Sequence, residues 1–170
     1  MSGARAVAKA PADTPRSAEP PAIRPAVAAD LPAIERLLRA ANLPLVGVAD
    51  SLDTFFVVEL AGEDHALAGV GGLELGRINA LVRSVVVGAD WRGQGLGRAL
   101  VQRLIAAAEQ RQVRTLYLLT TTAEHYFPEF GFSVVSRDDV PADIRESEEF
   151  RTACPASAIV MARSVGSGGE

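Results

Sequence analysis

Residues 92–98 have the composition of a turn that binds phosphate. They read Arg-Gly-Gln-Gly-Leu-Gly-Arg, follow an apolar, β-branched run that ends at Val87, and precede an amphipathic helical pattern. At such a strand–helix junction the first amide N–H groups of the helix have no intrahelical acceptor, and the positive end of the helix dipole lies beside them. Glycines let phosphate oxygens approach the backbone closely, so the segment predicts an anion site.

The glycine-rich turn by itself leaves two interpretations open, because similar turns also close ordinary strand–helix junctions. Two other phosphate motifs are excluded. A P-loop requires Gly-Lys-Ser/Thr, and the only lysine of the chain is Lys9. A dinucleotide-binding fingerprint requires Gly-x-Gly-x-x-Gly, which the spacing of Gly93, Gly95 and Gly97 does not give.

Arg83 is the second residue whose position suggests chemistry. It shares a face with Leu81 and Val85 in a predicted central strand, where an unpaired cation would be costly. Arg83 therefore either pairs with a structural carboxylate or binds an anionic substrate, and we favour the substrate. Ser84, next in the strand, is expected to face the opposite side and to be structural.

Three consecutive threonines follow another buried strand. Open α/β sheets bind ligands at the carboxyl ends of their strands, so at least one of Thr120, Thr121 and Thr122 should line a pocket.

The composition restricts the class of protein. The chain has 170 residues, 48% of them hydrophobic, and a net charge of −4, which fits one globular domain and gives no basic field for nucleic acid. No apolar run is long enough for a membrane span. The lone Cys154 and two distant histidines predict neither a disulfide framework nor a metal site. Arginine supplies all the basic residues except Lys9, so the folded body has no lysine for Schiff-base chemistry.

The order of predicted elements alternates strands and helices within one domain at residues 22–164. A proline-rich, disordered tail is expected at 1–21 and a flexible C-terminus at 165–170. Asp30 should cap the first helix, and the segment 45–53 is irregular. Strands are predicted at 23–25, 54–60, 66–75, 81–87, 113–119, 132–135 and 158–162, and helices at about 30–41, 96–112 and 123–130, with a helical turn at 141–145.

These motifs and this order resemble the GNAT N-acetyltransferases. The pattern Arg92-x-x-Gly95-x-Gly97 is similar to the loop that binds the pyrophosphate of acetyl-coenzyme A in that superfamily. Residues 117–132, Tyr-Leu-Leu-Thr-Thr-Thr-Ala-Glu-His-Tyr-Phe-Pro-Glu-Phe-Gly-Phe, resemble its segment that ends in aromatic-Gly-Phe. The resemblance covers residues 22–163. It implies an α/β fold with a mixed central sheet, flanking helices, and fourth and fifth strands that splay around the pantetheine arm.

Shorter motifs resemble particular members of the superfamily. Leu-x-Arg-Ser, Trp-Arg-Gly-x-Gly-Leu-Gly, Tyr-Leu-Leu-Thr-Thr-Thr, Val-Pro-x-x-Ile-Arg and Cys-Pro-Ala-Ser are similar to the arsenic-resistance N-acetyltransferases of bacterial arsenic operons. Leu-Thr-Thr and the His-aromatic-Phe spacing are similar to the acetyltransferase domain of N-acetylglutamate synthases.

The resemblance to the arsenic-resistance enzymes implies a cytoplasmic detoxifying enzyme that acetylates the α-amino group of a small anionic substrate, a glutamate-like arsenical or phosphinate. The alternatives are glutamate acetylation for arginine biosynthesis and a non-catalytic coenzyme A-binding sensor. Acetyl-coenzyme A is the expected co-substrate, a small amine the expected partner, and a homodimer is left open.

The resemblance also implies roles for individual residues. The main chain of Val85 and Val87 would bond the pantetheine amides, with the thioester near Val85. The expected cofactor-binding set is Val85, Val86, Val87, Arg92, Gly93, Gln94, Gly95, Leu96, Gly97, Arg98, His125 and Phe127. Arg83 and the three threonines would bind the acceptor. A helix-face role for His125 is the alternative to cofactor contact.

Glu74 and Tyr126 are the candidates for proton transfer. Glu74 would act as the base, directly or through water, unless it is only an exposed hairpin carboxylate. Many superfamily members have a tyrosine that acts as the general acid at the position of Phe127, and Tyr126 is one residue away. On a helix this offset turns the side chain by about 100°. We therefore predict that Tyr126 is not an essential acid.

Overall fold

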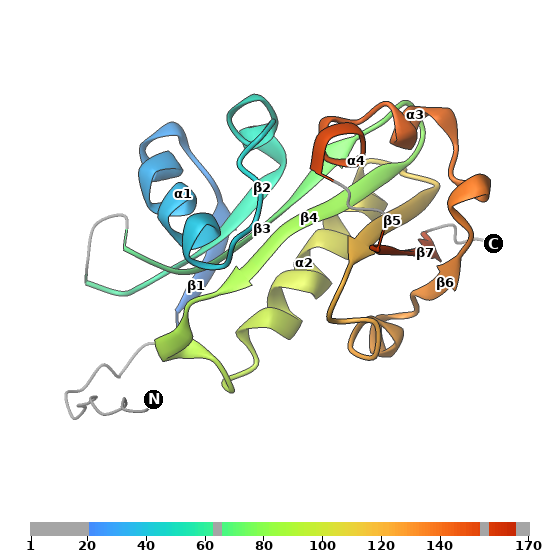
Figure 1. Ribbon diagram of the computed structural model, residues 1–170. Helices are drawn as coiled ribbons and strands as arrows, with labels where there is room; N and C mark the ends of the chain where they lie inside the picture. The colour runs from blue at the N-terminus through green and yellow to red at the C-terminus, as the bar shows by residue number, and fades with distance from the viewer. Residues whose placement is uncertain (1–20, 63–65, 154–156, 166–170) are drawn as a thin grey trace.

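The protein folds around one seven-stranded sheet. The structure, a computed structural model, describes residues 21–62, 66–153 and 157–165 (Figure 1). The strand order is β1-β2-β3-β4-β5-β7-β6, antiparallel throughout except for the parallel pair β4 and β5. The strands are β1 (Ala22–Pro25), β2 (Phe55–Glu59), β3 (Leu67–Leu75), β4 (Ala80–Val87), β5 (Thr115–Thr120), β6 (Ser133–Val135) and β7 (Ile159–Ser164).

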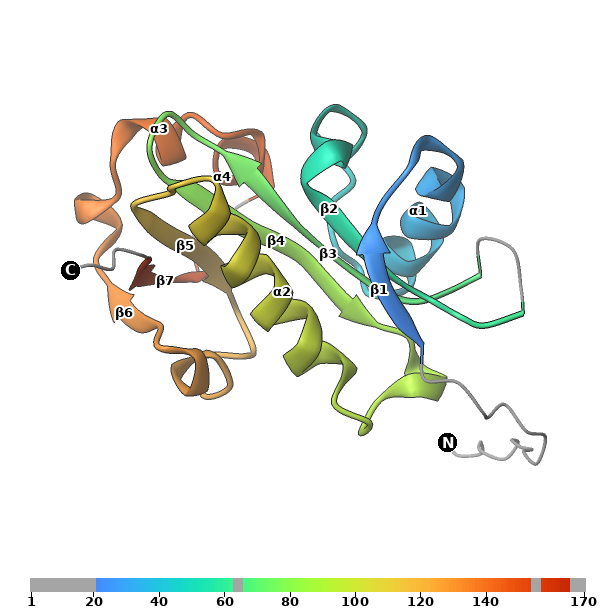
Figure 2. The same ribbon diagram turned by 180° about the vertical axis from the view of Figure 1, so that it is seen from behind.

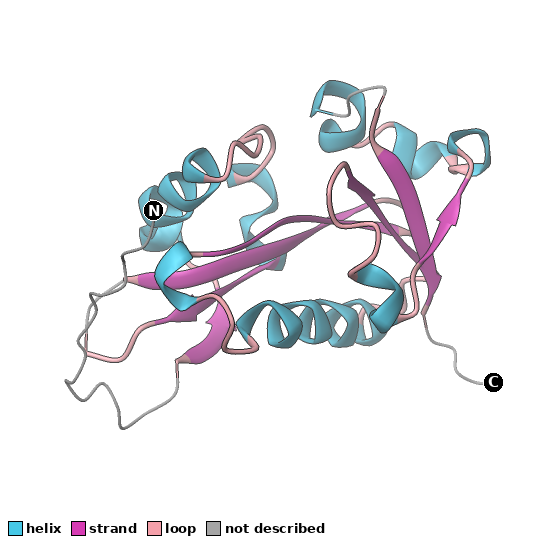
Figure 3. Cartoon of the chain, turned by 60° about the horizontal axis from the view of Figure 1, so that its bottom comes forward, coloured by secondary structure: helices cyan, strands magenta, loops and turns pink. Residues whose placement is uncertain are grey.

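Two long helices cover opposite faces of this sheet (Figure 3). Ile34 and Leu38 of α1 pack against Val57 and Val70 on one face. Seen from behind, α2 runs across the other face, where Leu104 lies in the main core (Figure 2). The α-helices are α1 (Leu31–Ala40), α2 (Leu96–Gln110), α3 (Ala142–Arg145) and α4 (Glu148–Ala153). Short 3₁₀ helices are η3 (Ala28–Asp30), η4 (Ala49–Thr54), η5 (Ala89–Trp91), η6 (Phe127–Phe130) and η7 (Arg137–Asp139).

A bulge in β4 sets the geometry of the site. Val70 pairs with Val86, but Gly72 pairs with Arg83, so β4 has one more residue than β3 between these pairs. Ser84 lies in the bulge with a φ of 62°, a left-handed conformation that side chains rarely adopt. Beside the bulge, β4 and β5 pair only at their beginnings, Ala80 with Leu116 and Leu81 with Tyr117. Beyond these pairs the two strands diverge (Figure 1).

The structure corrects several local predictions. Asp30 precedes α1, but its buried carboxylate binds Arg24 and the amide of Val27 instead of capping that helix. Residues 124–126 form a turn and only Phe127–Phe130 are helical, as the 3₁₀ helix η6, and α4 was not predicted. Val165, expected in a flexible end, is buried and donates its amide hydrogen bond to Arg114.

The predicted N-terminal tail, apart from Pro21, lies outside the described residues, as do Cys154 and residues 166–170. Among the described residues, no helix combines the length and the apolar character needed to cross a bilayer.

Candidate active site

The glycine-rich turn before α2 forms one wall of a cavity of about 330 Å³. Gly95 immediately precedes α2 with a φ of +84°, and Gly93 has a φ of +82°. A Cβ atom added at either position would meet no atom within 4 Å, so no neighbouring group covers the backbone there. The cavity is lined by Val87, Trp91, Arg92, Gly93, Gly95, Leu96, Gly97, Arg98 and Tyr126.

The beginning of α2 offers hydrogen-bond donors to this cavity. The amide of Ala99 donates to the carbonyl of Gly95, which is the first bond of the helix. The amides of Leu96, Gly97 and Arg98 therefore have no intrahelical acceptor. Together with the helix dipole, these donors form a site suited to an anion such as a pyrophosphate.

Two exposed arginines flank the turn. Arg92 donates from Nε to the carbonyl of Val87 at 3.1 Å, which places its side chain beside the end of β4. Arg98 forms an ion pair with Glu129, and its guanidinium carbon lies 5.4 Å from the centre of the Phe130 ring. Both cations are accessible to solvent and lie close enough to contact an anion bound at the turn.

A second cavity, of about 510 Å³, lies where β4 and β5 diverge. Tyr126 lines both cavities, so the two adjoin. Residues from distant parts of the chain line the second cavity, including Asn42, Pro44, Arg83, Ser84, Val85, Thr120, Thr121, Thr122, Phe127 and Glu149. A groove between splayed strands next to an anion site can hold an elongated cofactor and an acceptor together.

Arg83 is fully enclosed in a cluster with two carboxylates. Its side chain is 0% exposed, and Nη1 lies 3.1 Å from Oε1 of Glu74. Nη2 lies 3.3 Å from Oε1 of Glu149, and Nε donates to Oγ of Ser84 at 3.1 Å. Of the two interpretations of Arg83, pairing with structural carboxylates is therefore present in the structure. The cluster of one arginine and two glutamates has a formal charge of −1.

The expectation that Ser84 faces away from Arg83 is wrong. The bulge interrupts the alternation of side chains along β4, so Ser84 and Arg83 line the same cavity and bond to each other.

Glu149 is the member of the cluster that was not predicted from the sequence. It comes from α4, in the connection between β6 and β7, and its side chain is 14% exposed. Burial raises the pKa of Glu149 above its ordinary value, Arg83 acts in the opposite direction, and the negative charge of Glu74 adds to the rise. The requirement of Arg83 for a carboxylate partner was visible in the sequence, but no spacing rule connects it to Glu149.

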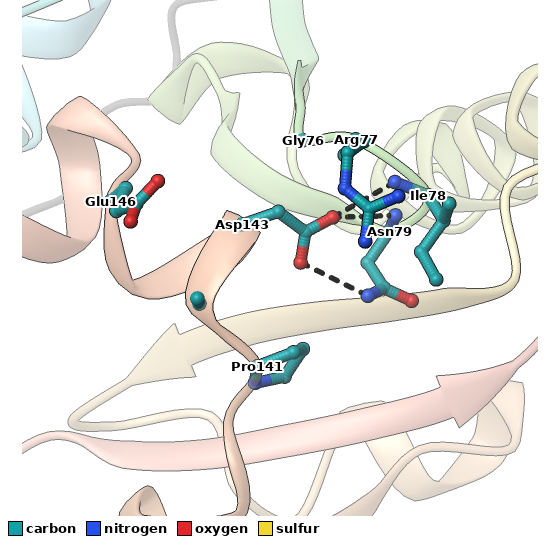
Figure 4. A pocket seen from close by; sticks show the side chains of 8 residues that line it. Gly76, Arg77, Ile78, Asn79, Pro141, Asp143 and Glu146 are labelled. Carbon is teal, nitrogen blue, oxygen red and sulfur yellow. Dashed lines mark hydrogen bonds between the residues drawn. The ribbon is translucent and has the colours of Figure 1, made fainter.

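The loop that carries Glu149 is fixed by a network at the turn between β3 and β4. The carboxylate of Asp143, in α3, accepts hydrogen bonds from the amides of Ile78 and Asn79 and from the side chain of Asn79 (Figure 4). Burial alone would raise the pKa of Asp143, but these hydrogen bonds outweigh it and hold the pKa below its ordinary value. A cavity of about 390 Å³ lies at this junction.

The threonines contribute to the second cavity in different ways. Oγ1 of Thr120 accepts hydrogen bonds from the amides of Ala123 at 2.8 Å and Thr122 at 3.3 Å, so it shapes the turn after β5. Thr121 and Thr122 line the same cavity and are exposed to solvent. They are therefore the threonines available to a ligand.

Four predicted site residues lie apart from the linings of both cavities. Glu74 is buried behind Arg83, and Val86 packs in the core beneath α1. Gln94 is exposed at the tip of the glycine-rich turn. The side chain of His125 is 96% exposed, with Nε2 at 3.9 Å from Oε2 of Glu124.

The two neighbouring aromatic residues are placed differently. The ring of Phe127 packs on Phe132 and Tyr126 and lines the second cavity. The hydroxyl of Tyr126 lies 3.4 Å from where a Cβ atom on Gly97 would be, beside the start of α2. Burial raises the pKa of Tyr126, so its hydroxyl is protonated at neutral pH.

Comparison with known proteins gives this arrangement a family. Residues 24–132 match the acetyltransferase (GNAT) family. An amino-acid acetyltransferase of Mycobacterium tuberculosis is 29% identical over an alignment of 135 positions that covers 73% of this chain and 75% of the relative. The amino-acid acetyltransferase of Escherichia coli K12 is 30% identical over 90 residues, which are 53% of this chain but only 20% of that protein.

Solved structures show the same fold. N-acetylglutamate synthase from Neisseria gonorrhoeae, in complex with coenzyme A and N-acetyl-glutamate, superposes with a TM-score of 0.73 and 21% identity. The match covers 86% of this chain and 35% of that chain. The predicted α/β fold, with a mixed central sheet and flanking helices, is confirmed, and its fourth and fifth strands are parallel.

Proposed function

Because this chain belongs to the acetyltransferase (GNAT) family and is an acetyl-coenzyme A-dependent N-acetyltransferase, we propose that its acceptor is the α-amino group of a free amino acid. The similar proteins are named amino-acid acetyltransferases, which supports an amino acid as the acceptor. The N-acetyl-glutamate bound in the synthase complex makes glutamate the first candidate. The arsenical or phosphinate acceptor and arsenic resistance, expected from the short motifs, have no support among these relatives. We therefore rank them second.

The observation that carries the proposal is the pairing of opposite charges, on Arg83 and Glu149, in the lining of the second cavity. Nη2 of Arg83 and Oε1 of Glu149 are 3.3 Å apart, and both residues line that cavity. An α-amino acid presents an ammonium group and a carboxylate on one carbon, so it offers the complementary pair of charges at a similar spacing. Arg83 has N–H groups beyond those that bond its three partners, and these can donate to the acceptor's carboxylate.

The cofactor is proposed to occupy both cavities. When bound, acetyl-coenzyme A supplies an activated acetyl group as a thioester. The glycine-rich turn and Arg98 would hold the pyrophosphate, and the main chain of Val85 and Val87, beyond the last pair of β4 with β5, would bond the pantetheine amides. An amide of β4 near Val85 would polarise the thioester carbonyl. Holding both substrates in adjoining cavities then replaces a bimolecular encounter.

Release of the free thiol tests the proposal. Purified protein, acetyl-coenzyme A and each of the common amino acids, together with a phosphinate analogue of glutamate, would be incubated with a thiol reagent. We expect acceptor-dependent thiol release, with an N-acetylated amino acid as the product. Coenzyme A binding without release for any acceptor would overturn the proposal and leave a non-catalytic module. Release with the phosphinate but no amino acid would favour detoxification.

A further inference from the structure

We infer that Glu149 is the base that accepts the proton from the acceptor's ammonium group, and that Glu74 only positions Arg83. The inference rests on the proposed function, because it assigns a residue to the acceptor amine of that reaction.

Access to the acceptor separates the two carboxylates. Glu149 lines the cavity between β4 and β5, which also contains Val85. Glu74 is absent from that lining, and its Oε1 already accepts hydrogen bonds from Arg83 at 3.1 Å and from the amide of Glu149 at 3.3 Å. Among the described residues, Oε1 of Glu149 is buried and accepts no hydrogen bond, and its one ion pair, with Nη2 of Arg83 at 3.3 Å, leaves it able to accept one. An acceptor amine in the cavity therefore meets Glu149 first.

The charge around Glu149 favours a cationic partner. Arg83 from β4 and Glu74 from β3 face it, and with Glu149 they sum to −1 in a region shielded from water. From the adjacent α3, Asp143 is occupied by its hydrogen bonds with the β3–β4 turn, and Glu146 is exposed. An ammonium group beside Glu149 neutralises the cluster. The raised pKa of Glu149 brings its basicity closer to that of an efficient proton acceptor.

The position of Glu149 is held by its own segment. Oγ of Ser147 accepts a hydrogen bond from the amide of Phe150 at 3.2 Å at the beginning of α4. The guanidinium carbon of Arg137 lies 5.8 Å from the centre of the Phe150 ring. Together with the bonds of Asp143 shown in Figure 4, these contacts fix the connection that carries the carboxylate. A base held in place loses little freedom when the acceptor binds.

The proposed step conserves atoms and charge. The ammonium group gives one proton to the carboxylate of Glu149, which becomes a neutral carboxylic acid. The nitrogen lone pair then forms a bond to the acetyl carbonyl carbon, the carbon–sulfur bond breaks, and the sulfur leaves as a thiolate. The new amide nitrogen loses a second proton, the thiolate takes up one proton, and Glu149 returns its proton to solvent.

A pH–rate profile of Glu149→Gln tests this role. In the wild type we expect kcat/KM to fall at low pH as Glu149 becomes protonated. In Glu149→Gln we expect kcat to fall by about 10²- to 10⁴-fold. The rising limb should also move to the alkaline range in which the acceptor amine loses its own proton. Glu146→Gln removes an exposed carboxylate from the same connection and should leave the rate and the profile unchanged.

Several outcomes decide the matter. A folded Glu149→Gln protein that keeps its activity within threefold of wild type, with the acidic limb of the pH–rate profile in place, would overturn the inference. If instead Glu74→Gln alone showed the fall in kcat expected of Glu149→Gln, the base would be Glu74. If Glu149→Gln does not fold, Glu149→Asp keeps the charge. A lower kcat with the acidic limb retained would then support the role, and an unchanged kcat would contradict it. Failure of the proposed function looks different, because the wild type itself would then acetylate no amino acid.

Discussion

Gly95 offers the sharpest test of where acetyl-coenzyme A binds. The substitution Gly95→Glu places a carboxylate in open space above the turn, since a Cβ atom there would meet nothing within 4 Å. The φ of +84° adds strain of about 1–2 kcal/mol for any residue with a side chain. Gly62→Glu is a matched control, because Gly62 has a φ of +82° and equally open surroundings in the turn between β2 and β3.

The expected effect on binding comes from charge repulsion. Two unit charges about 4 Å apart near a protein surface interact by about 4 kcal/mol, which salt reduces. We therefore expect the Kd for acetyl-coenzyme A to rise by about 10²- to 10³-fold in Gly95→Glu, since each 1.4 kcal/mol is about tenfold. Gly62→Glu should lose the same stability and keep its affinity. Calorimetry would measure both, and an unchanged Kd in folded Gly95→Glu would refute a pyrophosphate site at this turn.

Three further substitutions probe the second cavity and its support. Arg83→Met leaves two carboxylates without their cation and should lower the free energy of unfolding in urea by about 3–5 kcal/mol at pH 8. The loss should be smaller at lower pH, because the raised pKa of Glu149 lets that carboxylate become protonated. A loss below about 1 kcal/mol would contradict the buried pairing. Tyr126→Phe should reduce kcat less than tenfold, because its hydroxyl lies beside Gly97 at the start of α2; a larger loss in steady-state assays, with the alkaline limb abolished, would make it the acid. Asp143→Asn should lower the free energy of unfolding by about 1–3 kcal/mol at pH 7. This difference from the wild type should vanish as the pH falls through the lowered pKa of Asp143, and a difference that did not change with pH would show that protonation of Asp143 is not linked to stability.

The glycine-rich turn and most elements could be predicted because their signals are local. A β-branched run followed by closely spaced glycines specifies a strand, a turn and a helix start within a few residues. Gly93 and Gly95 adopt left-handed conformations that glycine accepts without cost, so their function in the turn follows from residue type. The apolar stripe of α2, which includes Leu100 and Leu104, likewise follows from the helical period.

The charged cluster that we propose as the acceptor site could not be predicted, because it is assembled by long-range contacts. Arg83 and Glu149 are far apart in the chain and meet only after the connection between β6 and β7 folds back over β4. That connection has no strong periodicity, so its short helix α4 was missed. The chemical need of a buried cation for a carboxylate was predictable. Which of the chain's many acidic residues would meet it depends on tertiary structure.

One extra residue in β4 links the two halves of the site. The bulge at Ser84 places successive side chains, Arg83 and Ser84, toward the same cavity, where a regular strand would send one of them to the other face. The same bulge lies where β4 has already lost its pairing with β5. The main-chain groups proposed to bind the cofactor therefore lie on β4 next to Arg83, the centre of the charged cluster proposed to bind the acceptor. A substitution that straightened this bulge should therefore disturb both proposed binding functions at once.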